Sequence, residues 1–135
     1  MSKKTILVVD DNDAVRDTVA AILSIGGYDV IEANSGETAL AIVARDKPDV
    51  VILDVCMPGM DGVSVLKESL RIQKDLVVIM LTAYSSARDS QNCMDLGAFD
   101  YICKPFDNKS FLEKVRTGLK HAESATVGGA SSVED

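Results

Sequence analysis

The fold is decided by one stretch near the middle of the chain, residues 50–62, which reads Val50-Val51-Ile52-Leu53-Asp54-Val55-Cys56-Met57-Pro58-Gly59-Met60-Asp61-Gly62. It opens with four consecutive aliphatic residues, a pattern typical of a strand that is buried on both faces of a sheet. The run ends at a carboxylate, Asp54, and the loop that follows is rich in turn-forming Pro and Gly. A buried strand that ends at an acidic residue predicts an α/β sheet with polar groups at the strand ends.

The same alternation of short apolar runs and helical stretches continues on both sides of this segment. Further strands are predicted at residues 6–9, 28–31, 76–81 and 101–103. Apolar residues between them recur at helical spacing, as in Val15, Val19, Ile22 and Leu23, Ser35 is a predicted N-cap, and a fourth helix is expected over about residues 86–96. Five βα units in series predict a parallel sheet with helices on both faces.

Composition and charge limit the function classes. The chain has 135 residues, 47% hydrophobic and 26% charged, which is typical of a single soluble domain. No apolar run approaches the roughly 20 residues that span a bilayer, and the first run ends at Asp10, too early for a signal-peptide core. A net charge of −7 disfavours direct contact with nucleic acid. We therefore expect a cytoplasmic protein that contacts neither membrane nor nucleic acid.

Two minor expectations concern the cysteines and the C-terminal residues. Cys56, Cys93 and Cys103 lack metal-binding spacing, so we expect reduced thiols, with Cys103 as buried filler. Residues from about 124 onward are small and polar. The predicted organisation is therefore one domain over residues 1–123 and a flexible tail or linker stub over residues 124–135.

Charged and hydroxyl side chains stand where four of the predicted strands end. Asp10 and Asp11 follow the first strand, Asp54 the third, Thr82 the fourth and Lys104 the fifth. Because the carboxyl ends of parallel strands lie side by side, we expect these residues to form one site. Three carboxylates repel one another, and hard oxygen ligands suit Mg²⁺, which together with the lysine would bring the site close to neutrality.

Four segments of the chain, taken together in their order and spacing, resemble the receiver (CheY-like) domain of two-component response regulators, and the resemblance covers residues 5 to about 121. They are Asp10-Asp11, Leu53-Asp54-Val55-Cys56-Met57-Pro58-Gly59-Met60-Asp61-Gly62, Leu81-Thr82-Ala83 and Gly97-Ala98-Phe99-Asp100-Tyr101-Ile102-Cys103-Lys104-Pro105-Phe106. The resemblance implies a doubly wound (βα)5 flavodoxin-like sandwich with a five-stranded parallel sheet of order 2-1-3-4-5.

The resemblance also implies a role for each acidic residue of the site. Asp54 is the expected phosphoacceptor nucleophile. Asp10 and Asp11 are the expected Mg²⁺ ligands together with Asp54, and the backbone carbonyl of Cys56 completes the protein's share of the ligand set. The alternative for Asp10 and Asp11 is a purely structural role as helix caps and dipole partners.

The residues on the fourth and fifth strands match the switch apparatus of the same family. Thr82 corresponds to the switch hydroxyl, Lys104 to the lysine that pairs with the phosphate, and Tyr101 to the aromatic switch residue. The resemblance further implies a cis peptide bond before Pro105. We expect the bulk of Tyr84, two residues past Thr82, to slow dephosphorylation by obstructing the attacking water.

These roles predict a signalling switch and not an enzyme, apart from catalysis of its own phosphorylation and dephosphorylation. A histidine kinase or phosphotransfer protein is the implied donor, and an effector domain or separate protein is the implied output. The last helix leaves open whether the domain forms a homodimer on phosphorylation.

Three other functions compete with this interpretation. Asp11-Asn12-Asp13 superficially fits the signature of haloacid-dehalogenase-type phosphotransferases, but the chain supplies no substrate cap. A flavin-binding electron carrier has the same topology, yet two carboxylates after the first strand would repel a flavin phosphate. A degenerate receiver that acts without phosphorylation is disfavoured because all the key residues are present.

Overall fold

The fold is built from a parallel sheet whose strands are β1 (Thr5–Val9), β2 (Asp29–Ala33), β3 (Val50–Asp54), β4 (Val77–Thr82) and β5 (Asp100–Cys103). The helices are α1 (Asp13–Ile25), α2 (Gly36–Asp46), α3 (Gly62–Ile72) and α5 (Asn108–Glu134). This computed structural model describes residues 4–54, 62–82, 94–104 and 106–134. Of the fourth helix that we predicted over about residues 86–96, only its end at residues 94–96 lies within the described residues.

The strand order is β2-β1-β3-β4-β5, and every pairing is parallel. Ile6 of β1, for example, lies beside Val30 of β2 and Val50 of β3. The predicted flavodoxin-like order is therefore confirmed. In this order the sheet reverses its winding between β1 and β3, which is where ligands bind in open α/β sheets.

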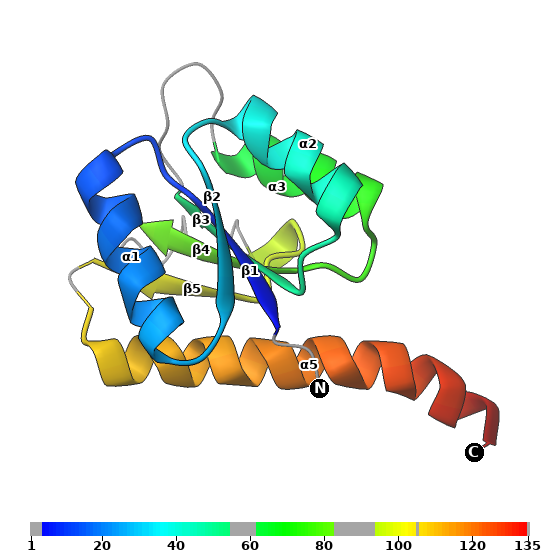
Figure 1. The fold of residues 1–135 in the computed structure, drawn as a ribbon. Coiled ribbons are helices and arrows are strands. Elements are labelled where there is room, and N and C mark those ends of the chain that lie inside the picture. The colour runs from blue at the N-terminus through cyan, green and yellow to red at the C-terminus, as the bar shows by residue number, and fades with distance from the viewer. Residues whose placement is uncertain (1–3, 55–61, 83–93, 105, 135) are drawn as a thin grey trace.

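Helices cover both faces of the sheet, as Figure 1 shows. On one face, α1 and α5 bury side chains against Ile6, Val8 and Ile52. On the other, α2 and α3 pack against Leu7 and Val9. Successive strand residues thus serve opposite cores, because side chains of a strand alternate between the two faces of a sheet. This double burial explains why the strand sequences are continuously apolar.

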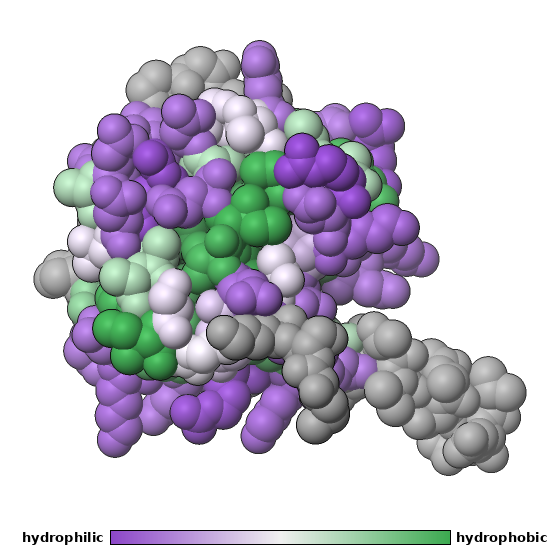
Figure 2. All heavy atoms as spheres, viewed as in Figure 1, coloured by the Kyte–Doolittle hydropathy of each residue, from purple (hydrophilic) through white to green (hydrophobic). Residues whose placement is uncertain are grey.

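The surface follows the same division. Figure 2 shows polar side chains over α1 and α2, with an apolar strip between them in the position that β2 occupies in Figure 1. In this edge strand Val30 and Ile31 are half-buried, and they pack against the two different cores. Among the described residues, no helix has the length and apolarity needed to cross a bilayer.

Helix caps place the first turn of α1 directly after the acidic pair. Asn12 is the N-cap, and its side chain accepts a hydrogen bond from the backbone N–H of Val15 at 3.0 Å. The predicted N-cap of α2, Ser35, is confirmed by its hydrogen bond from Thr38. The N-cap of α1 is therefore Asn12, and neither Asp10 nor Asp11, whereas a role for these two carboxylates as dipole partners stays an alternative.

Two expectations differ from the structure in detail, and a third, the flexible tail, stays a prediction. Asp54 and Thr82 are the last residues of their strands and do not follow them. Cys103 is half-buried because β5 is an edge strand, in which only Ile102 is fully buried. The helix α5 continues to Glu134, through the segment where we expected a flexible tail. Backbone hydrogen bonding that continues past residue 123 makes this segment helical, and its separation from the domain stays a prediction.

Candidate functional site

The carboxyl edge of the sheet brings the predicted site residues together. Asp10 directly follows β1, and Asp54 ends β3. Thr82 ends β4, and Lys104 directly follows β5. The parallel register aligns Asp54 with Leu81 and Thr82 with Cys103, so these positions lie at one level of the sheet.

Three carboxylates form a compact cluster at this edge. One oxygen from each of Asp10, Asp11 and Asp54 lies within 4.8 Å of the others. Asp10 is 1% exposed and Asp54 8% exposed, whereas Asp11 is exposed to solvent. Carboxylates held this close in a partly buried site repel one another, and a divalent cation would relieve that repulsion.

The atom that best tests whether a cation fits is Oδ2 of Asp10. Oδ1 of the same carboxylate accepts a hydrogen bond from the Asn12 backbone N–H at 2.9 Å. Oδ2 is buried and accepts no hydrogen bond from the residues that the structure describes. Buried polar atoms are ordinarily satisfied, so this oxygen is in the state expected of a metal ligand. The oxygen-rich donor set fits Mg²⁺.

Lys104 supplies the positive charge of the site. Its Nζ lies 3.7 Å from Oδ2 of Asp10 and 3.9 Å from Oδ1 of Asp54. Its backbone N–H donates to the Thr82 carbonyl at 2.7 Å, which ties the lysine to the end of β4. Both ion-pair distances exceed the usual hydrogen-bond length, so the ammonium lies near both carboxylates without forming a short hydrogen bond to either.

The predicted switch residues lie on neighbouring strands. Thr82 is buried at the end of β4, while Tyr101 of β5 is half-buried and pairs in register with Met80. The Lys114 ammonium lies 5.8 Å from the centre of the Tyr101 ring and forms a 3.0 Å ion pair with Asp100. Tyr101 is therefore linked to α5 and is not part of the carboxylate cluster.

Several predictions fall on residues outside the described part of the chain. They are the metal-binding carbonyl of Cys56, the bulk of Tyr84 and the cis peptide bond at Pro105, and they stay predictions.

Sequence reasoning missed Arg16, which contacts the site from α1. Its Nη1 donates to the backbone carbonyl of Asp10 at 2.9 Å, and its other nitrogens contact Asp13 and Glu32. The only available signal was an arginine about one turn into a helix that starts beside the acidic pair. That signal alone does not distinguish it from a solvent-exposed arginine.

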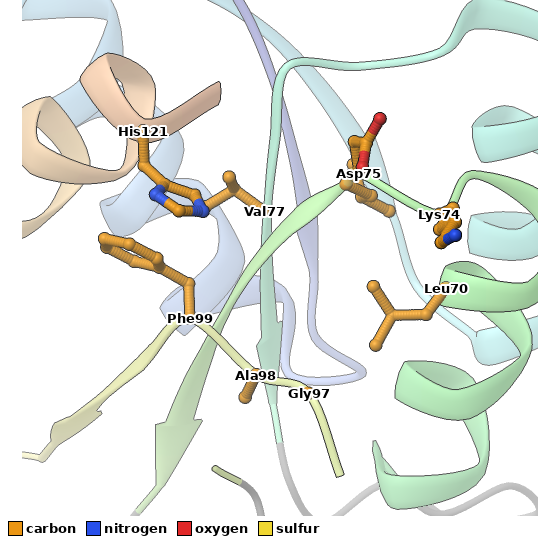
Figure 3. A pocket seen from close by; sticks show the side chains of 9 residues that line it. Leu70, Lys74, Asp75, Val77, Gly97, Ala98, Phe99 and His121 are labelled. Carbon is orange, nitrogen blue, oxygen red and sulfur yellow. The ribbon is translucent and has the colours of Figure 1, made fainter. Parts of the chain in front are cut away.

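The opposite, amino edge of the sheet contains a cavity of about 440 Å³. Figure 3 shows it between Leu70 at the end of α3 and His121 of α5, whose ring lies 4.9 Å from that of Phe99. None of the predicted site residues within the described chain lines this cavity. The chemistry that we predicted therefore belongs to the carboxyl edge and not to this cavity.

Fold and site together define a class of protein, a doubly wound α/β domain with an acidic, lysine-bearing cluster at the carboxyl edge of its sheet. The family model described as the response regulator receiver domain matches residues 6–116. The chain belongs to this family, so it is a phosphoacceptor switch of two-component signalling. Domains of this kind are signalling switches and are not generally classed as enzymes.

Known proteins with similar sequences and structures agree with this assignment. The chain is 44% identical over 126 residues to a protein named probable transcriptional regulator ycf27 from Porphyridium aerugineum, covering 93% of this chain and 52% of the relative. It is 42% identical over 118 residues to the response regulator MprA of Mycobacterium leprae, covering 87% and 52%. A CheY-like receiver domain protein from Methanospirillum hungatei JF-1 superposes with a TM-score of 0.87 at 31% identity, covering 92% of this chain and 99% of that one. The chain thus spans about half the length of the curated relatives it matches.

Proposed function

We propose that Asp54 is the residue that accepts the phosphoryl group and that Asp10, Asp11 and Asp54 bind Mg²⁺. The observation that carries this proposal is the buried Oδ2 of Asp10, which has no hydrogen bond from the described residues and lies beside Asp11, Asp54 and the Lys104 ammonium. A partly buried cluster of carboxylates is costly unless a cation or another positive group balances its charge.

The proposed donor is a phosphohistidine of a histidine kinase or phosphotransfer protein. A carboxylate oxygen of Asp54 attacks the phosphorus in line while the phosphorus–nitrogen bond to the donor breaks. The bonding electron pair stays on the imidazole nitrogen, and an acyl phosphate forms on Asp54. The three aspartates and, as the family resemblance implies, the backbone carbonyl of Cys56 would hold Mg²⁺. The ion would supply positive charge that balances the carboxylates and the phosphoryl oxygens.

Lys104 and Thr82 are the proposed partners of the new phosphoryl group. Phosphorylation adds negative charge at Asp54. The Lys104 ammonium lies 3.9 Å from Asp54 and needs to move only a short distance to pair with the phosphoryl group. Thr82 stands at the end of the neighbouring strand, where its hydroxyl can donate to a phosphoryl oxygen. We propose that these contacts shift Thr82 and, through β5, Tyr101.

The proposed output is an effector domain or a partner protein. The matched relatives include proteins named as a transcriptional regulator and a response regulator, each about twice as long as the matched region. A shift of the Thr82–Tyr101 region would alter the surface formed by β5 and α5. Coupling between such sites is typically about 1–3 kcal/mol, enough to change partner affinity about 5- to 150-fold. The cytoplasm is the proposed location, on the ground of the family's function alone.

The test is intact-mass spectrometry after incubation with acetyl phosphate, on the wild type and on Asp54→Asn, with and without Mg²⁺. We expect one phosphoryl increment in the wild type with Mg²⁺, and none in Asp54→Asn or after removal of Mg²⁺. An Asp54→Asn variant that gains the same increment would show that another residue is the acceptor. A wild type that gains none from acetyl phosphate or from a phosphohistidine donor would favour a degenerate receiver.

A further inference from the structure

Arg16 joins three elements through one guanidinium group. Nη1 donates to the Asp10 backbone carbonyl at 2.9 Å, Nε to Glu32 at 3.2 Å and Nη2 to Asp13 at 2.6 Å. These partners belong to the end of β1, to β2 and to the first turn of α1. The Arg16 side chain is 14% exposed, whereas that of Asp13 is 80% exposed. The arginine side chain is therefore largely buried, and each of its three guanidinium nitrogens donates one hydrogen bond.

The contact with Asp10 leaves little freedom to that residue. Its backbone N–H donates to the Ala33 carbonyl at 3.1 Å, its carbonyl accepts from Arg16, and its Oδ1 accepts from the Asn12 N–H. Oδ2, the oxygen facing Lys104, is the remaining polar atom. The Asp10 carbonyl also belongs to the planar peptide unit that joins Asp10 to Asp11, so a donor that fixes this carbonyl orients both residues.

The charge of Arg16 is not what the site uses. Asp13 and Glu32 both form ion pairs with the guanidinium, at 2.6 and 3.2 Å, and together they more than balance its single charge. The hydrogen bond to Asp13 raises the pKa of Arg16, a group that is protonated at neutral pH in any case. Arg16 therefore acts on the acidic pair by orienting the Asp10 carbonyl, because two partners outside the site, Asp13 and Glu32, hold its donors at fixed positions.

We infer that Arg16 is a positioning residue for divalent-cation binding, because it holds the Asp10–Asp11 peptide so that both carboxylates face Asp54. This inference rests on the proposed function, since it assumes that the cluster binds Mg²⁺. It adds a residue that is not itself a ligand and identifies the backbone carbonyl as the atom through which it acts. Groups that orient metal ligands in this way typically change metal affinity about 10–100-fold when they are removed.

The test is an NMR titration of the ¹⁵N-labelled protein with MgCl2 in the absence of any phosphodonor. Arg16→Lys keeps the charge but cannot reproduce three donors in one plane, so we expect its dissociation constant for Mg²⁺ to rise about tenfold or more. The matched control is Arg71→Lys, which loses an equivalent contact with Glu68 on the surface of α3. We expect the control to bind Mg²⁺ within about twofold of the wild type.

A second variant keeps the inference testable if Arg16→Lys does not fold, which the same spectra reveal. Asp13→Asn combined with Glu32→Gln retains Arg16 but removes the charged partners that hold it, and we expect a smaller rise in the dissociation constant. A folded Arg16→Lys with unchanged Mg²⁺ affinity would overturn the inference and leave the proposed function intact. So would an equal loss in Arg71→Lys, which would indicate a general effect of replacing arginine by lysine that does not depend on the contact with Asp10. A wild type that does not bind Mg²⁺ would remove the proposed metal site and this inference together.

Discussion

The two edges of the sheet contain opposite kinds of buried group. Among the residues that the structure describes, the buried polar side chains are Asp10, Asp54, Thr82 and Ser69, and all but Ser69 lie at the carboxyl edge. The amino edge instead surrounds a cavity of about 440 Å³ with side chains such as Leu76, Val77 and Phe99. Lys74 and Asp75, the charged residues of this cavity lining, are exposed. One set of strands thus supports two different environments.

This difference shows where a change in charge can influence the protein. Burying charged groups costs free energy unless they are paired, and the carboxyl edge brings three carboxylates to a single lysine. A cation or a covalent phosphoryl group changes that balance directly. Lys74 and Asp75 beside the amino-edge cavity are exposed charges that water already solvates, so the same change there has little effect.

The largest expected difference between the edges lies in phosphorylation by acetyl phosphate. Lys104→Met removes the ammonium 3.9 Å from Asp54, and we expect phosphorylation to slow about 100-fold. Lys74→Met makes the same substitution at the amino edge, where we expect no change in rate. Intact-mass measurements over time give both rates. Equal slowing in the two variants would contradict the proposed role of Lys104.

The next expected effect concerns stability without metal. Asp10→Asn keeps the Oδ1 acceptor used by Asn12 and removes one of three clustered charges, so we expect the free energy of unfolding to rise by about 1 kcal/mol in EDTA. With saturating Mg²⁺ the wild type should become the more stable of the two proteins, because it gains free energy from metal binding and the variant, with one ligand fewer, gains less. Urea unfolding with EDTA and with MgCl2 measures both.

The control for this prediction is Asp75→Asn at the amino edge, where the side chain is exposed. We expect its stability to stay within about 0.5 kcal/mol of the wild type in both buffers. A less stable Asp10→Asn in EDTA would mean that the Lys104 ion pair and the buried position favour the carboxylate more strongly than its neighbours repel it.

The sequence was sufficient to locate the carboxyl edge. In a parallel sheet the ends of strands far apart in sequence must lie together, so Asp10, Asp54, Thr82 and Lys104 could be assigned to one site from strand boundaries alone. An error of one residue at a boundary, as for Asp54 and Thr82, does not move the side chain to a different edge. The family resemblance then supplied the expected chemical roles.

Contacts that depend on helix placement could not be predicted in the same way. Arg16 reaches Glu32 only because α1 packs beside β2, and the distance between those elements is set by the core beneath them. The half-burial of Cys103 likewise depends on β5 being an edge strand. The cavity at the amino edge has no sequence signal, because its lining comes from several separate segments.

The smallest expected effect separates two kinds of carboxylate near the carboxyl edge. Unlike Asp10, Asp107 lies in an exposed position before α5, and its Oδ2 accepts a hydrogen bond from the Ser110 backbone N–H at 3.0 Å. That hydrogen bond lowers the pKa of Asp107 below its ordinary value of 3.8. The charged cap therefore adds stability above that value and loses it as the pH falls through the lowered pKa of the folded protein.

Asp107→Asn keeps a capping oxygen and removes the charge. The change that it causes in the free energy of unfolding should therefore be opposite in sign to the change caused by Asp10→Asn. We expect the variant to be slightly less stable than the wild type at neutral pH, and the difference to disappear as the pH falls through the lowered pKa of Asp107. Urea unfolding of both proteins across this range measures the difference, and Asp107→Ser, another uncharged cap, should behave alike. A stability difference that persists in acid would assign the effect to the geometry of the cap. A difference that disappears would show that a carboxylate in this region stabilises the fold when a hydrogen-bond donor faces it and destabilises the fold when other carboxylates face it.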